Sequence, residues 1–218
     1  MKKINYGKLF NMFIDPNGEE RGLNHPFIQD EKYIASDGVS LIYLPVEKAT
    51  LNFPKQDKPN ISSTISAENN CSILLNVKKL EEQLVPEMID EEKILYEDCS
   101  ECKGEGYVIY TYSGEKDYEE ELECPKCDGK CEKKIVEKTG KQIPNDWKLF
   151  QLIDSYFAYR QLRRLIDAVN LIGVDEITLE VRGEKKANRF SVGDFKIIIM
   201  SSYSEGYKTQ HLAYELKY

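Results

Sequence analysis

The segments Cys99-Ser-Glu-Cys102-Lys-Gly104-Glu-Gly106 and, seventeen residues later, Cys124-Pro-Lys-Cys127-Asp-Gly129-Lys-Cys131 decide how this chain is organised. Each contains a Cys-x-x-Cys knuckle, a turn that brings two thiolates to one metal ion. Four thiolates complete the tetrahedral shell that zinc prefers, and a closed shell leaves no position for a reacting water. The spacing predicts one structural zinc bound by Cys99, Cys102, Cys124 and Cys127.

The cysteines also allow other interpretations. The two Cys-x-x-Cys pairs could be redox-active or free thiols, and Cys131 could replace Cys127 as a ligand. We expect Cys131 to stay outside the site, because the paired spacing of Cys124 and Cys127 already suffices. Strands at 93–96 and 107–112, with a tip at 114–117, predict that the insert is an extended β-hairpin pinned at its base by the metal.

Length and composition bound the remainder of the chain. With 218 residues, 41% of them hydrophobic, it can form one large domain that carries a small insert. We expect a discontinuous body of residues 1–96 and 135–218 around a zinc-binding insert at 97–134. Since the ends of an insert lie close together, Tyr96 and Ile135 are expected on neighbouring strands. No bilayer-length apolar run and no signal-like N-terminus is present, so we expect no membrane partner and a cytoplasmic location.

The net charge of −8 is concentrated in the insert. Between Glu97 and Cys131 there are eleven Asp or Glu and four Lys, a net charge of −7. Zinc with four thiolates adds two further negative charges. The insert is therefore a poor candidate for binding phosphates, whereas the nearly neutral body remains a candidate.

The body pattern predicts an α+β fold. We expect an Asp37-Gly38 hairpin within 32–45, a loop at 49–70, a strand at 72–77 with a helix at 78–85, and a strand at 147–153. Asp154 or Ser155 is expected to cap a helix that ends before Gly173, and a three-stranded meander follows at 176–181, 189–192 and 195–200. Strand, Leu-rich helix and further strands recur near residues 4, 73 and 149. This recurrence predicts βαβββ repeats, with antiparallel sheet and helices on one side, interrupted by the zinc hairpin.

Two families resemble parts of this pattern. The first knuckle matches the Cys-x-x-Cys-x-Gly-x-Gly repeat of the cysteine-rich domain of DnaJ-type co-chaperones, and the second departs from it at Cys131. Four segments of the body resemble the bacterial DNA sliding clamps, the processivity factors of replicative polymerases. These segments are Ala35-Ser-Asp-Gly-Val-Ser-Leu41, Asp154-Ser-Tyr-Phe157, Asp175-Glu-Ile-Thr-Leu179 and Phe195-Lys-Ile-Ile-Ile-Met200.

The clamp resemblance implies helices that present Lys and Arg to duplex DNA without reading its sequence. It would assign this role to Arg160, Arg163, Arg164, Lys78 and Lys79, whereas the simpler alternative is that the three arginines form the solvated face of an amphipathic helix. A ring of such domains would require a homo-oligomer.

We therefore expect a non-enzymatic, clamp-like accessory protein, related to replication and encoded by a phage or mobile element, whose zinc hairpin binds a protein. The alternatives are a chaperone-like adaptor whose zinc hairpin binds polypeptide, and an enzyme with a site built from scattered Asp, Glu and Tyr.

Overall fold

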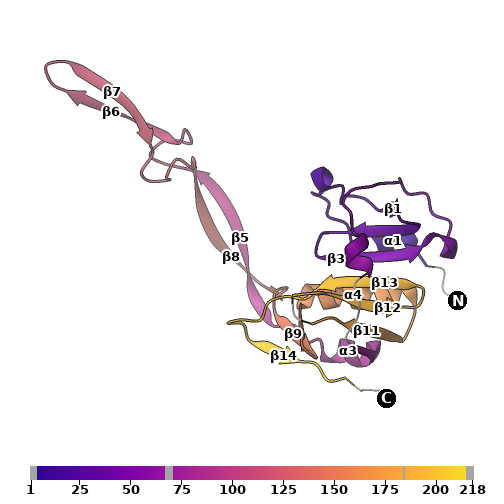
Figure 1. The fold of residues 1–218 in the computed structure, drawn as a ribbon. Helices are drawn as coiled ribbons and strands as arrows, with labels where there is room; N and C mark the ends of the chain where they lie inside the picture. Colours follow the sequence, from indigo (N-terminus) through magenta and orange to yellow (C-terminus); the bar gives the residue numbers. More distant parts are fainter. Residues whose placement is uncertain (1–3, 67–70, 184, 215–218) are drawn as a thin grey trace. The chain divides into compact units, whose positions relative to one another are not determined.

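The computed structural model describes residues 4–66, 71–183 and 185–214, which divide into two compact units (Figure 1). The body is formed by the residues up to Glu87 and from Asn145 onward, and the second unit is Met88–Pro144. The second unit is longer at both ends than the insert expected at 97–134, because its two outer strands extend beyond the knuckles. No helix among the described residues is long and apolar enough to cross a membrane.

The body is built on a seven-stranded sheet in which every neighbouring pair is antiparallel. The hairpin expected around Asp37-Gly38 and the meander expected at 176–200 are both present in it. Asp37 stabilises the hairpin turn, because its Oδ1 accepts hydrogen bonds from the amides of Val39 and Ser40 at 2.8 and 2.6 Å. In sheet order the strands are β1 (Phe27–Gln29), β2 (Lys32–Ser36), β3 (Ser40–Pro45), β13 (Phe195–Met200), β12 (Ala187–Val192), β11 (Glu176–Val181) and β4 (Cys71–Asn76).

Three helices pack on one face of this sheet, as the α+β pattern predicted. They are α1 (Tyr6–Asn11), α3 (Val77–Gln83) and α4 (Tyr159–Ile172). Leu162, Leu165, Ile166 and Val169 of α4 are fully buried in one apolar cluster with alternate residues of the strands and with Leu80 of α3. This spacing follows the helical period of about 3.6 residues, and α4 ends at Ile172, before Gly173 in the left-handed conformation with φ of +84°.

The opposite face of the sheet is covered in part by α2 (Ser62–Ser66), a short helix within the segment expected to be a loop. Phe27, Ile34 and Ile198 form a smaller apolar cluster there, with Ile61 and Ile65 packed against it. Arg182 and Arg189 each donate a hydrogen bond to a carbonyl near the end of α2, at 3.0 and 3.1 Å. The short 3₁₀ helices of the body are Glu19–Arg21 and Val46–Lys48.

A three-stranded sheet completes the body and corrects one expectation. It contains β10 (Ser155–Ala158), β9 (Leu149–Leu152) and β14 (Thr209–His211), for the last of which the sequence predicted no element. Asp154 and Ser155 do not cap α4, since Ser155 begins β10 and the helix begins only at Tyr159. The βαβββ order is complete from β10 to β13, whereas no described strand precedes α1.

The second unit is a pair of two-stranded ribbons (Figure 1), and each strand of one ribbon is joined to a strand of the other through one cysteine knuckle. The first ribbon pairs β5 (Met88–Asp98) with β8 (Glu132–Pro144), and the second pairs β6 (Tyr107–Ser113) with β7 (Asp117–Glu123). Leu95 lies opposite Ile135 and Tyr96 opposite Lys134, so the prediction that 96 and 135 sit on neighbouring strands is confirmed.

Candidate metal centre

Four buried cysteines lie together at the junction of the two ribbons. Cys99 and Cys102 follow β5, while Cys124 and Cys127 follow β7. The sulfurs of Cys99 and Cys124 are 3.8 Å apart, those of Cys102 and Cys127 are 3.7 Å apart, and all four lie within 4.8 Å of one another. Metal–sulfur bonds of about 2.3 Å separate the corners of a regular tetrahedron by about 3.8 Å. The cysteines expected from the spacing therefore form a cluster of the size that a tetrahedral metal ion requires.

Backbone hydrogen bonds hold both knuckles in shape. The Lys103 amide donates to the Cys99 carbonyl at 2.6 Å, and the Gly106 amide donates to the Cys102 sulfur at 3.2 Å. Gly106 has φ of +83°, and a Cβ there would lie 2.9 Å from both the Cys131 sulfur and the Gly129 carbonyl oxygen. This position of the first knuckle therefore accepts only glycine without movement of its neighbours.

Cys131 takes the place of the corresponding glycine in the second knuckle. Its φ of +67° is also left-handed, so the backbone follows the same path although the side chain differs. The Cys131 carbonyl accepts a hydrogen bond from the Cys99 amide at 2.8 Å, whereas its sulfur lies 3.6 Å from the Gly129 carbonyl oxygen. Cys131 thus contacts the site through its backbone and lies outside the group of four sulfurs.

The metal-free thiols differ in acidity. Hydrogen bonds from the backbone amides of Cys102 and Glu101 lower the pKa of Cys99 to about 7. Burial raises the pKa of Cys127 to about 12, with hydrogen bonds to neighbouring thiols acting in the same direction. Because metals bind the thiolate, a proton has to leave Cys127 when a metal ion enters.

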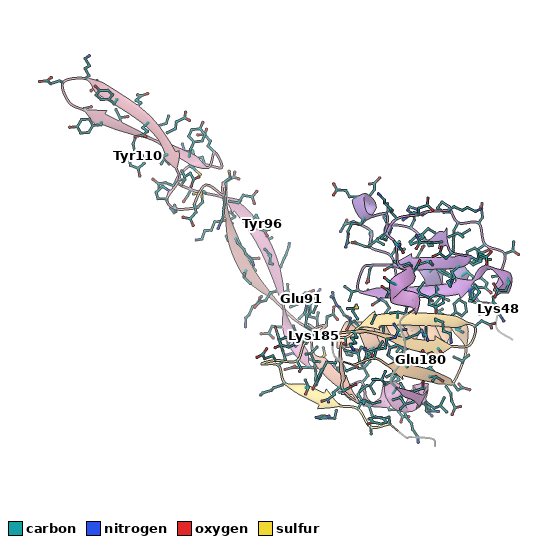
Figure 2. All side chains as sticks on the ribbon, in the orientation of Figure 1. Lys48, Glu91, Tyr96, Tyr110, Glu180 and Lys185 are labelled. Carbon is teal, nitrogen blue, oxygen red and sulfur yellow. The ribbon has the colours of Figure 1, made fainter. Side chains whose placement is uncertain are left out.

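The β6–β7 hairpin next to the cluster has two different faces. Residues paired across a hairpin point to the same side, so Val108 with Leu122, Tyr110 with Glu120 and Tyr112 with Tyr118 share one face. We call this the aromatic face; Tyr110, Tyr112 and Tyr118 are 52%, 71% and 63% exposed there. The opposite, acidic face carries Asp117, Glu119, Glu121 and Glu123 of β7. Figure 2 shows Tyr96 on the first ribbon and Tyr110 on the second.

Sequence reasoning missed this division of faces. Strand propensity accounts for tyrosines in these strands but does not assign them to a face. The available signal was the tip at Gly114: once the hairpin register is known, the period of two places Tyr110, Tyr112 and Tyr118 on one side and Glu119, Glu121 and Glu123 on the other.

The three arginines expected to contact DNA lie together on α4. Arg160, Arg163 and Arg164 line one shallow cavity of about 290 Å³, which Asp146 and Asp167 also line. Arg163 donates to Asp167 at 3.0 Å and to Glu81 of α3 at 2.8 Å, and these hydrogen bonds raise the Arg163 pKa. Arg164 pairs with Asp37, and the Arg160 guanidinium lies 3.6 Å from the centre of the Trp147 ring. Two of the three positive charges are therefore already compensated.

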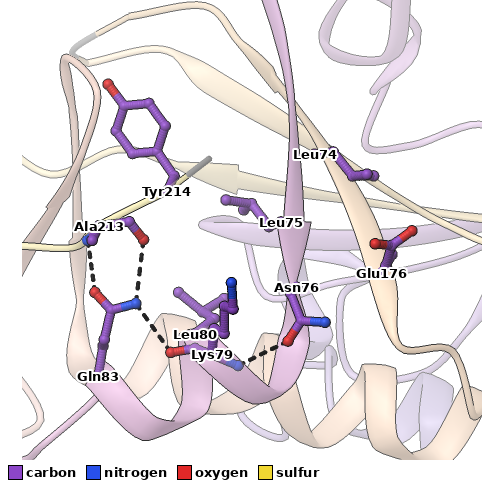
Figure 3. A pocket seen from close by; sticks show the side chains of 9 residues that line it. All are labelled: Leu74, Leu75, Asn76, Lys79, Leu80, Gln83, Glu176, Ala213 and Tyr214. Atoms are coloured by element: carbon purple, nitrogen blue, oxygen red, sulfur yellow. Dashed lines mark hydrogen bonds between the residues drawn. The ribbon is translucent and has the colours of Figure 1, made fainter. Parts of the chain in front are cut away.

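Lys78 and Lys79 lie exposed on α3, and Lys79 also lines a cavity of about 420 Å³ (Figure 3). The polar groups around this cavity hold the fold together. Asn76 caps α3 by accepting a hydrogen bond from the Lys79 amide at 3.0 Å. Gln83 ties the C-terminal segment to α3, because it donates to the Ala213 carbonyl at 3.2 Å and accepts from the Ala213 amide at 2.6 Å.

This chain is similar to known sliding clamps in its structure but not detectably in its sequence as a whole. No protein-family model matches the chain, and no curated protein matches its sequence. Similar solved structures include the Helicobacter pylori beta clamp bound to a DNA ligase peptide, with 10% identity and a TM-score of 0.47 over 91% of this chain and 62% of that one. The Thermotoga maritima DNA polymerase III beta subunit gives 12% identity and a TM-score of 0.47 over 91% and 63%. The Pseudomonas aeruginosa DNA polymerase sliding clamp gives 11% and 0.45 over 92% and 65%. This chain spans less than two thirds of the length of these clamps.

Proposed function

We propose that this chain is a zinc-containing, non-enzymatic accessory protein with a clamp-like body, whose β6–β7 hairpin binds another protein. The observation that carries the proposal is the buried cysteine cluster, which fixes the base of a hairpin with exposed tyrosines. We assign the metal as zinc, since four thiolates in tetrahedral spacing form the closed structural site that zinc prefers. Cys99, Cys102, Cys124 and Cys127 would hold the ion, which supplies stability and no reaction.

The exposed aromatic face is the reason to propose protein binding. Aromatic side chains are enriched in the cores of protein interfaces, where they bury a large area and still satisfy a polar group. Two observations support a clamp-like body with a role in DNA replication. Four sequence segments resemble clamps, and the helices gather on one face of an antiparallel sheet.

Site-specific crosslinking tests the docking proposal. A photoreactive residue at Tyr112 is expected to crosslink to a protein in cells that encode this chain, and the crosslink is expected to disappear in the Cys124→Ser variant. The same photoreactive residue at Glu19, which is exposed on the body, serves as the control. Absence of a crosslink at Tyr112 that depends on the intact cysteines would refute docking through the hairpin.

A second candidate, association with duplex DNA, is favoured by the gathering of Arg160, Arg163 and Arg164 around one cavity. Binding of this kind would be independent of sequence and would weaken steeply with salt, because it would rest on a few phosphate contacts. The test is duplex binding at low and moderate salt by the wild type and the triple Arg→Glu variant. Equal binding by both proteins, or no binding at low salt, would refute this candidate.

A further inference from the structure

The two ribbons of the second unit differ in how their charged residues are paired across the strands. Along β5 and β8, opposite charges face each other at three positions, where Lys93 lies across from Glu137, Glu92 from Lys138 and Glu97 from Lys133, whereas Asp98 lies across from Glu132. Opposite-charge cross-strand pairs stabilise an isolated ribbon from within. Three of the four charged pairs across this ribbon are therefore attractive.

The acidic face of the second hairpin has no such compensation. Across the strand pair, Glu119 meets Thr111, Glu121 meets Ile109 and Glu123 meets Tyr107. No ion pair between the described side chains includes a carboxylate of β7. Five of the seven residues of β7 are acidic, so the strand carries a dense, uncompensated negative charge.

The outer edge of β7 is also unpaired within the part of the chain that the structure describes, because the β6–β7 sheet has only two strands. An unpaired edge offers a row of backbone amides and carbonyls to an added strand. Charges on an edge can serve simply to prevent aggregation, but that role requires no aromatic residues on the other face. The exposed Tyr110, Tyr112 and Tyr118 leave an apolar surface uncovered as well.

We propose that the free edge of β7 binds an extended segment of a partner protein in which basic and apolar residues alternate. Side chains of an added strand alternate between the two faces. Lys or Arg at every second position would then lie opposite Glu119, Glu121 and Glu123, while the apolar residues between them would lie beside Tyr118, Glu120 and Leu122. Negative charge repels a second copy of the hairpin, nucleic acid and an anionic membrane, which leaves a basic polypeptide as the partner.

This inference rests on the proposed docking function and specifies the partner's chemistry, so its test uses defined peptides. The probe is a fluorescent peptide that alternates Lys with Val and Tyr, titrated into the zinc-loaded full chain at low salt. Two controls are a peptide of the same composition with the lysines in one block, and a peptide with Glu in place of Lys. We expect the alternating peptide to bind, the block peptide to bind about tenfold more weakly, and the acidic peptide not to bind. On binding, β7 amides are expected to gain protection from hydrogen exchange, whereas β5 amides are not.

The variant Glu119→Lys/Glu121→Lys is expected to lose at least about tenfold in affinity for the alternating peptide, because two attractive cross-strand pairs become repulsive. Its matched control, Glu19→Lys/Glu20→Lys, makes the same change in net charge at exposed body positions and is expected to bind normally. Equal binding of the alternating and block peptides, equal loss in both variants, or binding without protection of β7 would overturn the inference. If crosslinking at Tyr112 succeeds while these peptides fail, the docking function stands and only the basic strand is refuted.

Discussion

Replacement of Cys124 by serine is the most decisive perturbation of this chain. Cys124 is fully buried, and its sulfur lies 3.8 Å from the Cys99 sulfur. Serine is nearly isosteric but cannot provide a thiolate. The variant therefore removes one corner of the tetrahedron while changing the surrounding turn little.

The expected loss in metal affinity can be bounded from below. Removal of a group that only supports a ligand typically costs about 10- to 100-fold in affinity. Removal of the ligand itself breaks a metal–sulfur bond, so we expect a loss of more than about 100-fold, which corresponds to more than about 2.7 kcal/mol.

The structural consequence should be confined to the second unit. Within Met88–Pro144 the only buried side chains are those of the four cysteines. An isolated two-stranded ribbon is at best marginally stable in water, so the hairpin depends on the metal. We expect amides of β6 and β7 to exchange rapidly in the variant, while amides of β12 and β13 in the body stay protected.

The assay is zinc content per chain together with chelator competition, and Cys131→Ser is the matched control. It removes a thiol of the same segment that lies outside the group of four, and it is expected to keep one zinc with nearly unchanged affinity. Normal zinc affinity in Cys124→Ser, or loss of zinc in Cys131→Ser, would refute this assignment of ligands.

Three further predictions concern acidity, backbone and core. Zinc affinity is expected to fall by about tenfold or more per pH unit below neutrality, because the raised pKa of Cys127 means that a proton competes with the metal throughout this range; chelator competition at pH 6 and 7 measures the change, and equal affinity at both would contradict it. Gly106→Ala is expected to weaken zinc binding, since its Cβ meets two atoms at 2.9 Å, whereas Gly173→Ala has open space and should cost only about 1–2 kcal/mol of body stability from its left-handed backbone. Similar effects of both substitutions on zinc affinity would argue against the contact at Gly106. Phe190→Ala is expected to destabilise the body by about 3–5 kcal/mol in urea unfolding without loss of zinc, because Phe190 is fully buried against Phe157; a change below about 1 kcal/mol would contradict its place in the core.

Local signals predicted much of this structure. The Asp37-Gly38 turn, the end of α4 before Gly173, and the two knuckles each depend on a few neighbouring residues, and the structure contains all of them. Their physical basis lies in turn geometry and periodicity, which a single sequence displays.

The features that were missed depend on distant or unusual contacts. Sequence reasoning assigned β10 to the start of α4. The turn before β10 places Ile153 at φ of +57°, a conformation that a β-branched residue rarely adopts, so the residues of this turn do not indicate a hairpin. β14 forms by pairing in parallel with β9, which lies far away in the sequence. The outer parts of β5 and β8 lack an alternating apolar pattern, because most of their side chains are exposed on both faces.

Charge separates the two candidate functions of this chain. Arg163 and Arg164 already bind Asp167, Glu81 and Asp37, so a phosphate would have to replace existing carboxylate contacts. The field of the acidic insert adds to this cost, since its net charge is −7 before the metal site is counted. Replacing residues 107–123 with a Gly-Ser linker should therefore have opposite effects on the two ligands. Duplex affinity at low salt should stay the same or rise because negative charge is removed, whereas affinity for the alternating basic peptide should be lost with its binding strand.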